Sequence, residues 1–392
     1  MRVIFILLVF LFPFSCLAQL KDTINCNGSL NLYSFGAKLD GVSDDSQAWQ
    51  DAINYATSIK GKSRWIEQPT NTVSRITKSL VIGGDFIPLE LCFKNIDSVN
   101  CYQCNFNEYL NGIRKINIKI TGKGESAIYA DFNDTNKLRA AIYIGAMYGR
   151  SPASLEQYNL EVSNIGIYAQ GYFIAGKRNQ NVIDYSNNNV AAIAALFCQG
   201  LKVSDMTIYG FKEGIIGNNN YFFDMSAVTF NRCKRGSFDI RCHRGNYTNI
   251  NTFDCNKGIE IRSNKILLNG LYAMRCITGL HVAGSNNIVN SAYFESPLFT
   301  QGQVIIGDSI GGLIEGITFN DLTIASAYPT RIGMWLRNNV KNITINDGIM
   351  QSQYVVYDNL NSRIYAKTVL GNLPTAITVR ANFIDINGKT IL

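Results

Sequence analysis

The chain has 392 residues, of which 46% are hydrophobic and 17% charged, and its formal net charge is +7. This composition excludes an intrinsically disordered chain, because such chains combine low hydrophobicity with high net charge. The basic residues are not gathered into a stripe with interleaved aromatics, so we expect no nucleic-acid partner. The basic excess is compatible with an acidic polysaccharide as the partner, and it leaves the oligomeric state open.

Residues 1–18 have the pattern of a signal peptide. Arg2 supplies a positive charge, residues 3–12 form an apolar segment too short to span a bilayer, and Ala18 precedes the expected cleavage site. The alternative is a lipoprotein that is lipidated at Cys16. No later segment predicts a transmembrane helix, so we expect a secreted, periplasmic or cell-envelope protein.

The next segment predicts an N-terminal cap. Residues 31–35 indicate a short strand that ends in a turn at Gly36. Ser43 or Asp44 can cap the helix that follows, in which apolar residues recur at helical spacing. These apolar residues are Ala48, Trp49, Ala52, Ile53 and Ala56. We therefore expect a cap of strand, turn and short helix over about residues 19–60.

The cap sequence carries a family resemblance. Residues 35–48 read Phe-Gly-Ala-Lys-Leu-Asp-Gly-Val-Ser-Asp-Asp-Ser-Gln-Ala, which resembles the N-terminal signature of the pectate-lyase-like superfamily, including rhamnogalacturonase-like and polygalacturonase-related proteins and phage tailspikes. The likeness continues more loosely over residues 79–82 and 116–128. It implies a parallel β-helix that handles a polysaccharide, with Asp44 and Asp45 in the cap rather than in catalysis. The polygalacturonase elements Asn-Thr-Asp, Gly-His-Gly and Arg-Ile-Lys are absent, so the resemblance does not extend to that hydrolase site.

A repeat of about 22 residues follows the cap and the irregular segment after it. In each unit a glycine precedes a short apolar strand, and these glycines are Gly214, Gly236, Gly258 and Gly279, with spacings of 22, 22 and 21 residues. A unit this short cannot bury its own apolar side chains, so neighbouring units must stack. We predict one all-β domain over residues 19–392, a single-stranded right-handed parallel β-helix of about 9 to 11 coils.

Stacking also predicts columns of like residues. Cys233, Cys255 and Cys276 each stand three residues before a repeat glycine and should form one buried column. Three sulfurs in a straight ladder cannot surround a metal ion tetrahedrally, so we expect packing and no metal site. Asparagine-rich corners over residues 218–220 and 285–287 predict side-chain amide ladders.

The same alignment predicts a charged patch on the outer surface. Ile240, Ile261 and Val282 are placed in one inward column, so that their neighbours along each strand point outward. The predicted catalytic residues are Asp239, Glu260 and His281, and the predicted substrate-binding residues are Arg241, Arg262, Asp254 and Arg275. The alignment assigns one extra residue, Ser237, to its coil, and a shift by one residue would turn Asp239 inward.

This patch offers several kinds of chemistry. Stacked carboxylates about 5 Å apart can act as nucleophile and acid in a retaining glycosidase, and such stacking raises one of their pKa values. His281 could serve as acid or base, while the arginines could bind a uronate carboxylate during β-elimination. An Asp239–Glu260 ladder could also bind Ca²⁺. The alternatives are glycan binding without catalysis and a solvated charged face.

The sequence thus predicts a secreted protein that acts on a polysaccharide, as a lyase or a glycoside hydrolase for an acidic glycan. The alternative is a non-catalytic glycan-binding or adhesin-type β-helix protein of the cell envelope. Aromatic residues on coils near the patch could extend a groove, although their ordinary role is packing. The residues in question are Tyr272, Tyr293 and Phe294, with Glu295 beside them.

Overall fold

The computed structural model describes residues 23–58, 63–82, 117–132, 139–145, 160–174, 177–178, 189–196, 198, 200–218, 220–295, 302–307, 313–325, 330–337, 340–346, 348–350, 352–358 and 363–367. The predicted signal peptide and Cys16 lie outside these residues. Among the described residues, no helix has the length and hydrophobicity needed to cross a bilayer.

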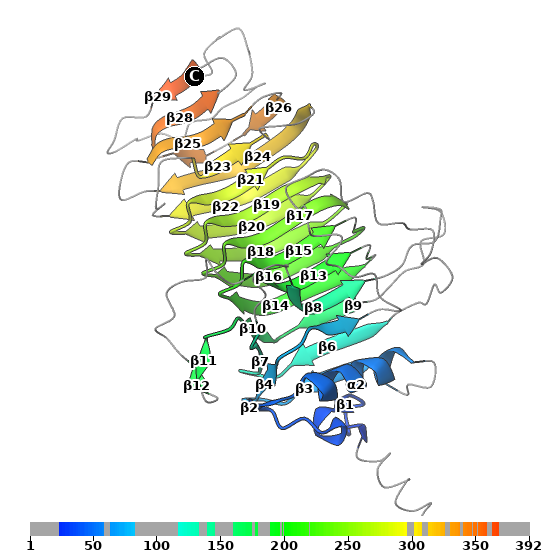
Figure 1. Ribbon diagram of the computed structural model, residues 1–392. Helices are drawn as coiled ribbons and strands as arrows, with labels where there is room; N and C mark the ends of the chain where they lie inside the picture. The colour runs from blue at the N-terminus through cyan, green and yellow to red at the C-terminus, as the bar shows by residue number, and fades with distance from the viewer. Residues whose placement is uncertain are drawn as a thin grey trace, which may run out of the picture.

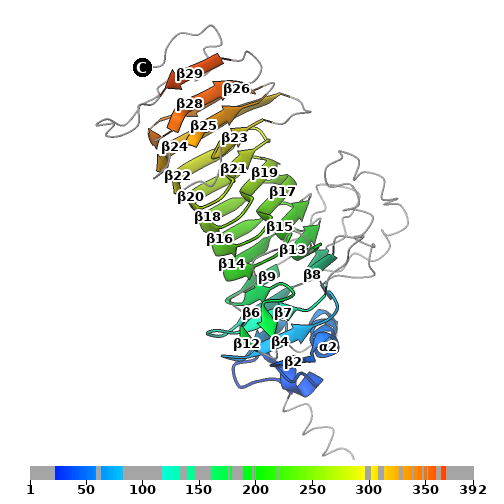
Figure 2. The same ribbon diagram turned by 60° about the vertical axis from the view of Figure 1, so that its left-hand side comes forward.

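The described chain winds as a parallel β-helix whose coils stack from the N-terminal to the C-terminal end (Figures 1 and 2). The strands belong to two sheets, which in the described part of the chain hold 16 strands (sheet A) and 11 strands (sheet B). From β13 to β26 successive strands alternate between these two sheets. Strand β14 (Leu201–Tyr209) pairs with β16 (Asp224–Asn231) in sheet A, and β15 (Glu213–Asn218) pairs with β17 (Arg235–His243) in sheet B. All four strands run parallel to their partners, which confirms the predicted fold class.

The other strands extend these two sheets along the helix axis. Sheet A also contains β1 (Leu30–Asn31), β2 (Asp40–Asp44), β3 (Trp65–Gln68), β4 (Val73–Ile76), β6 (Ile118–Gly122), β7 (Ala127–Ala130), β9 (Leu160–Ser163), β10 (Gly166–Tyr168), β18 (Asn246–Phe253), β20 (Leu267–Met274), β22 (Ile288–Glu295), β24 (Ile314–Ala325), β26 (Val340–Ile345) and β27 (Gly348–Met350). Sheet B also contains β5 (Leu80–Ile82), β8 (Arg139–Gly145), β13 (Val190–Leu196), β19 (Lys257–Asn264), β21 (Thr278–Val282), β23 (Val304–Ile306), β25 (Thr330–Leu336), β28 (Ser352–Asp358) and β29 (Arg363–Lys367), the last antiparallel to β28. Strands β11 (Phe173–Ile174) and β12 (Lys177–Arg178) form a separate antiparallel pair.

The repeat glycines lie above one another, as their spacing predicts. A Cβ atom added to Gly236 would come within 2.4 Å of the carbonyl oxygen of Gly258, and one added to Gly258 within 2.4 Å of that of Gly279. Any larger residue would therefore collide with the backbone of the next coil. Glycine therefore recurs because neighbouring coils approach closely where each of these sheet B strands begins.

Six sheet A strands of the regular coils, the even-numbered strands from β14 to β24, are interrupted near their middle by one residue in the left-handed region. Asn249 in β18, Gly270 in β20 and Ser291 in β22 occupy this position, with φ values of 53°, 73° and 52°. Asp205 and Asp321 hold it in β14 and β24, with φ values of 52° and 59°. Aspartate, asparagine and glycine adopt this conformation at low cost, and the interruption divides the outer face of sheet A into two strips.

The N-terminal cap contains the predicted helix, α2 (Ser46–Thr57). It lies at the N-terminal end of the stack of β-helix coils (Figure 1). Its predicted apolar face is buried, and the Trp49 indole donates a hydrogen bond of 2.8 Å to Ser74. The Asp45 carboxylate accepts hydrogen bonds from the backbone of Lys38 and Leu39, which supports its structural role. The strand expected over residues 31–35 is wrong beyond Asn31, because Leu32–Phe35 form a 3₁₀ helix that ends at Gly36 with φ 92°.

The predicted cysteine column is confirmed as part of the core. Cys233, Cys255 and Cys276 are each 1% exposed, and all three are free thiols. The corner asparagines differ from prediction, because Asn220 and Asn287 bond to the backbone of the preceding coil rather than to other side-chain amides. An amide ladder does exist, but it runs along the outer face of sheet A through Asn269, Asn290 and Asn320, with bonds of 2.6 and 2.7 Å.

Candidate functional site

The predicted outward column of sheet B is correct for two of its three members. Glu260 pairs in register with His281, but Glu260 stands beside Phe238 rather than Asp239. Strand β17 does carry one extra residue, yet the register shift lies between Ile240 and His243 and not at Ser237. Asp239 therefore pairs with Ile261 in the inward column, and its predicted place beside Glu260 is wrong.

Asp239 lies inside the β-helix and is fully buried. The adjacent coil carries Gly217 at the paired position, and a Cβ there would stand 3.0 Å from Asp239 Oδ1, so the missing side chain makes room for the carboxyl group. The Tyr247 hydroxyl donates a hydrogen bond to Asp239 Oδ2, whereas Oδ1 has no partner among the described residues. Burial raises the pKa of Asp239 to about 7, and the Tyr247 hydrogen bond opposes that rise.

The separation of Asp239 from Glu260 removes two predicted arrangements. A carboxylate pair for retaining cleavage is not formed, and neither is the acid ladder considered for Ca²⁺, because the two side chains point to opposite faces of sheet B. The predicted binding residues Arg241 and Arg262 do not stand side by side on their strands, since Arg262 pairs with Ile240 and Arg241 falls within the register shift. Among the described residues, no group of three or more His, Cys, Asp or Glu side chains could hold a metal ion.

Glu260 is fully buried beneath a shell of cations. Its carboxylate oxygens lie 2.8 Å from Arg262 Nε, 2.9 Å from Lys257 Nζ and 3.2 Å from Arg235 Nη1. Burial alone would raise the pKa of Glu260, but His281 and the surrounding cations together hold it well below its ordinary value. Glu260 is thus a carboxylate at neutral pH that holds cations in place, and it is not suited to act as a general acid.

His281 completes the wall beside Glu260. Its Nδ1 lies 3.5 Å from Glu260 Oε1, and its Nε2 lies 2.8 Å from the carbonyl oxygen of Gly307. The side chain is only 2% exposed. Both ring nitrogens therefore face protein groups rather than solvent.

A second buried carboxylate lies under the same surface. Glu213 forms a bidentate ion pair with Arg235, with both N–O distances 2.7 Å. Burial raises the pKa of Glu213, although the Arg235 charge opposes the rise. Arg235 also lies over the Phe238 ring, with Cζ 3.9 Å from the centroid. The guanidinium is held by two carboxylates and one ring, so its position is strongly determined.

Glu213, Arg235 and His281 line a groove of about 430 Å³ on the outer face of sheet B, which we call the cationic groove. Its cationic lining residues are Lys212, Lys234, Arg235, Lys257 and Arg337. Lys212 Nζ donates to Asn189 at 2.8 Å, and the Arg337 guanidinium lies 4.8 Å from the Trp335 ring centroid. Lys234 is exposed and has no hydrogen-bond or ion-pair partner for its side chain among the described residues. The groove therefore presents positive charge that the two buried carboxylates only partly neutralise.

The two other predicted binding residues lie at the corner before sheet B. Arg275 forms a bidentate ion pair with Asp254, with distances of 2.6 and 2.8 Å. Both residues have left-handed backbone conformations, and so has Arg232 at the equivalent position of the preceding coil. None of the three lines the cationic groove. The two predicted binding residues thus stand at the same corner of successive coils, and they already neutralise each other.

The predicted aromatic extension lies on another face. Tyr272 and Tyr293 stack on each other with ring centroids 5.6 Å apart, and Tyr293 is 39% exposed. They belong to β20 and β22 of sheet A, so they cannot extend a groove on sheet B. Phe294 is buried in the core, and Glu295 accepts a hydrogen bond from the Tyr272 hydroxyl.

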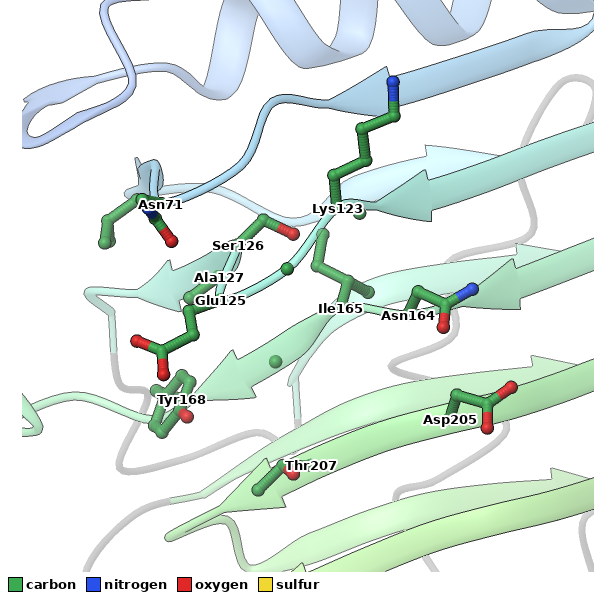
Figure 3. Close-up of a pocket in the computed structure, with 14 residues that line it drawn as sticks. Asn71, Lys123, Glu125, Ser126, Ala127, Asn164, Ile165, Tyr168, Asp205 and Thr207 are labelled. Atoms are coloured by element: carbon green, nitrogen blue, oxygen red, sulfur yellow. The ribbon is translucent and has the colours of Figure 1, made fainter.

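A larger groove, of about 790 Å³, lies on the N-terminal part of sheet A (Figure 3). We call it the sheet A groove, and its polar lining includes Asn71, Lys123, Glu125, Ser126, Asn164, Tyr168, Asp205 and Thr207. Sequence reasoning missed this site, because most of its residues come from irregular early coils that lie before the 22-residue repeat. The available signal was the Gly122–Gly124 turn, which the family resemblance includes, but nothing in the sequence places Asp205 beside that turn.

No family model matches this sequence, and no curated protein matches it. Several solved structures do match. A tailspike protein of E. coli bacteriophage HK620, solved in complex with a hexasaccharide, is 10% identical with a TM-score of 0.52, and the match covers 87% of this chain and 62% of the tailspike. DFA-IIIase from Arthrobacter chlorophenolicus A6 is 12% identical with a TM-score of 0.49, covering 84% and 88%. The Streptococcus pneumoniae surface protein and adhesin PfbA is 11% identical with a TM-score of 0.47, covering 84% and 100%.

At these identities the similarity is one of fold, and this chain shares the parallel β-helix of the tailspike. The match covers 62% of the length of the tailspike and 65% of the length of the protein ORF18 of Geobacillus virus E2. This chain therefore spans less than two thirds of either protein.

Proposed function

We propose that this protein binds an acidic polysaccharide in the cationic groove of sheet B. The observation that carries the proposal is the lining of one groove by Lys212, Lys234, Arg235, Lys257 and Arg337. Arginine and lysine bind carboxylates and sulfates through charge-assisted hydrogen bonds, which are about twice as strong as neutral ones. A groove with this lining favours a glycan that carries an anionic group on its sugar units.

The stacking of coils supports a repeating ligand. Lys212, Lys234 and Lys257 come from three successive coils, and neighbouring coils in such a stack are about 4.8 Å apart. Cations therefore recur along the axis of the β-helix. A chain of uronate units places carboxylates along one direction in the same way, so several contacts can form at once.

The buried carboxylates have a supporting role in this proposal. Glu260 and Glu213 hold Arg235 from two sides, and Glu260 also holds Lys257. This arrangement fixes two of the binding cations before the ligand arrives, which reduces the entropy lost on binding. Arg262, which bonds to Glu260, lies beside the same network.

A location outside the cytoplasm belongs to the proposal. The signal-peptide pattern of residues 1–18 predicts export. The HK620 tailspike, which has the same fold, was solved with a bound hexasaccharide, and this supports a glycan as the ligand class.

Cleavage of the bound glycan, by a lyase or glycosidase mechanism, is the second candidate. It is favoured by His281, which lines the cationic groove next to Glu260. Binding without cleavage has more support, because both nitrogens of His281 face protein groups and Glu260 is held as a carboxylate. Asp239, the third predicted catalytic residue, lies in the core and cannot reach a bound glycan.

Titration calorimetry with oligogalacturonate tests the proposal. Lys234→Ala should weaken binding about tenfold, or about 1.4 kcal/mol, because one charge-assisted contact is lost. The matched control is Lys78→Ala, which removes an exposed lysine from the N-terminal end of the chain and should leave binding unchanged. Equal affinities of the two variants would contradict the proposal. Incubation of the wild type with uronate polysaccharides decides the second candidate, which requires new reducing ends or unsaturated products.

A further inference from the structure

The sheet A groove differs from the cationic groove in the sign of its charge. Glu125 and Asp205 are both exposed in it, and neither has a hydrogen-bond or ion-pair partner among the described residues. The one lysine in the lining, Lys123, is engaged by Glu67 at 2.8 Å. Two uncompensated carboxylates therefore dominate the electrostatics of this groove, and they would repel the acidic glycan proposed for sheet B.

The backbone conformation determines where the two acidic residues stand in this groove. Glu125 follows Gly124, whose φ is 52°, in the tight turn between β6 and β7, while Asp205 occupies the left-handed position of β14. Asn164 on the coil between them has the same conformation, with φ 53°. Figure 3 shows Glu125 beside Tyr168, and Asp205 below Asn164. The acidic groups thus flank a polar strip that crosses several coils.

An aromatic ring lies along one side of the sheet A groove. A Cβ on Gly166 would stand 2.6 Å from Tyr168 Cε2, so glycine at this position lets the ring lie against the strand. Tyr168 also stacks on Tyr209, with centroids 6.1 Å apart and an interplanar angle of 21°. The ring is therefore held in place and can offer an apolar face to the apolar face of a sugar.

The groove also contains a buried hydroxyl without a partner. Ser126 is 3% exposed, and its Oγ has no hydrogen-bond partner among the described residues. In Figure 3 the hydroxyl points toward Ile165, another lining residue. A buried polar group without a partner costs free energy, and a ligand hydroxyl in the groove, directly or through a water molecule, would supply that partner.

We propose that the sheet A groove is a second carbohydrate site, which binds a glycan carrying free amino groups. The ammonium groups would pair with Glu125 and Asp205, and a sugar ring would pack on Tyr168. The volume of about 790 Å³ lies within the range of ordinary ligand sites. The protein would then carry two glycan sites of opposite charge preference, one on each sheet.

Titration calorimetry with two matched tetrasaccharides tests this proposal. A tetramer of glucosamine carries four amines, whereas the tetramer of N-acetylglucosamine has the same rings and linkage without the charge. In mildly acidic buffer of low salt, the wild type should bind the glucosamine tetramer at least about tenfold more tightly, because ammonium–carboxylate pairing is charge-assisted. Equal affinity for the two tetramers would overturn the proposal.

Variants of the two acidic residues test whether the glucosamine tetramer binds in the sheet A groove. Asp205→Asn and Glu125→Gln should each weaken binding of the glucosamine tetramer severalfold, and together at least about tenfold. The matched control is Asp321→Asn, because Asp321 is also exposed and occupies the same left-handed position in β24. Asparagine tolerates this conformation, so both substitutions should leave the fold intact. An Asp205→Asn variant that binds like Asp321→Asn would contradict the assignment.

The outcome is independent of the function proposed for sheet B. Lys234→Ala should lose affinity for oligogalacturonate and keep its affinity for the glucosamine tetramer, whereas the Asp205 and Glu125 variants should show the reverse. Loss of one preference without the other identifies which of the two proposals fails.

Discussion

Asp239 and Glu260 stand on neighbouring strands of sheet B, one register position apart, and the two faces of the sheet give them opposite environments. Both carboxyl groups are fully buried. Glu260, on the outer face, is surrounded by three cations and has a lowered pKa, whereas Asp239, on the inner face, has one tyrosine hydroxyl and a pKa raised to about 7. The difference teaches that the partners, and not the burial, decide the charge of a carboxyl group here.

The largest expected effect concerns the inner face. Because the pKa of Asp239 rises from 3.8 to about 7 on folding, the native protein keeps a proton that the unfolded chain releases between these values. Its free energy of unfolding should therefore fall as the pH rises through this window, by about 4 kcal/mol from this group. Asp239→Asn removes the titration. Urea unfolding measured over this pH range should show that the wild type loses stability relative to the variant as the pH rises. If the free energies of unfolding of the two proteins change in parallel with pH, the raised pKa of Asp239 is contradicted.

The next effect concerns the outer face. Glu260→Gln keeps the size of the side chain but leaves Arg235, Lys257 and Arg262 without their shared carboxylate. We expect a loss of about 3 kcal/mol, the low end for a broken buried ion pair, because Lys257 and Arg262 keep some contact with solvent. The measurement is denaturant unfolding at neutral pH. Glu125→Gln, an exposed control, should change stability by less than about 0.5 kcal/mol.

The pH dependence of that loss has the opposite sign to that of Asp239. The pKa of Glu260 is lowered on folding, so its contribution is present above its ordinary value of 4.5 and is lost on acidification. The stability difference between the wild type and Glu260→Gln should therefore shrink in acid. A difference that grows in acid would show that Glu260 is not the anchor of these cations.

The smallest of the three effects comes from the partner of Asp239. Tyr247→Phe removes the hydroxyl that donates to Asp239 Oδ2, which should cost about 2 kcal/mol. The cost should be greater above pH 7, where Asp239 is ionised and needs the donor more. Tyr293→Phe, on an exposed ring, is the control for thermal unfolding and should have almost no effect. A cost that is the same at all pH values would mean that the hydroxyl does not act through the Asp239 charge.

The same pair of residues shows how far sequence reasoning reaches. The spacing of Gly214, Gly236, Gly258 and Gly279 predicts the stacking of coils, because any side chain at these positions would meet the next backbone. It also predicts that Glu260 lies beside His281, which the register confirms. What spacing alone could not place was the extra residue of β17. A bulge can lie anywhere along a strand, and here it lies after Ile240, which turns Asp239 inward.

The grooves were harder to predict than the coils. The cationic groove needs residues from several coils and the distant Arg337, so it follows from the complete stack rather than from any motif. The sheet A groove draws Asn71 and Glu125 from coils without a regular repeat and Asp205 from the first regular coil, so no alignment of the sequence with itself brings them together.

The central claim is that an acidic polysaccharide occupies the cationic groove, and lysine footprinting tests it most directly. The protein would be acetylated at lysines with and without oligogalacturonate, and the modification of each lysine would be read by mass spectrometry. We predict that the ligand protects Lys212 and Lys234, which line the groove, and leaves the exposed Lys78 unprotected. Equal modification of Lys234 with and without the ligand, or protection at Lys123 in the sheet A groove instead, would contradict the claim.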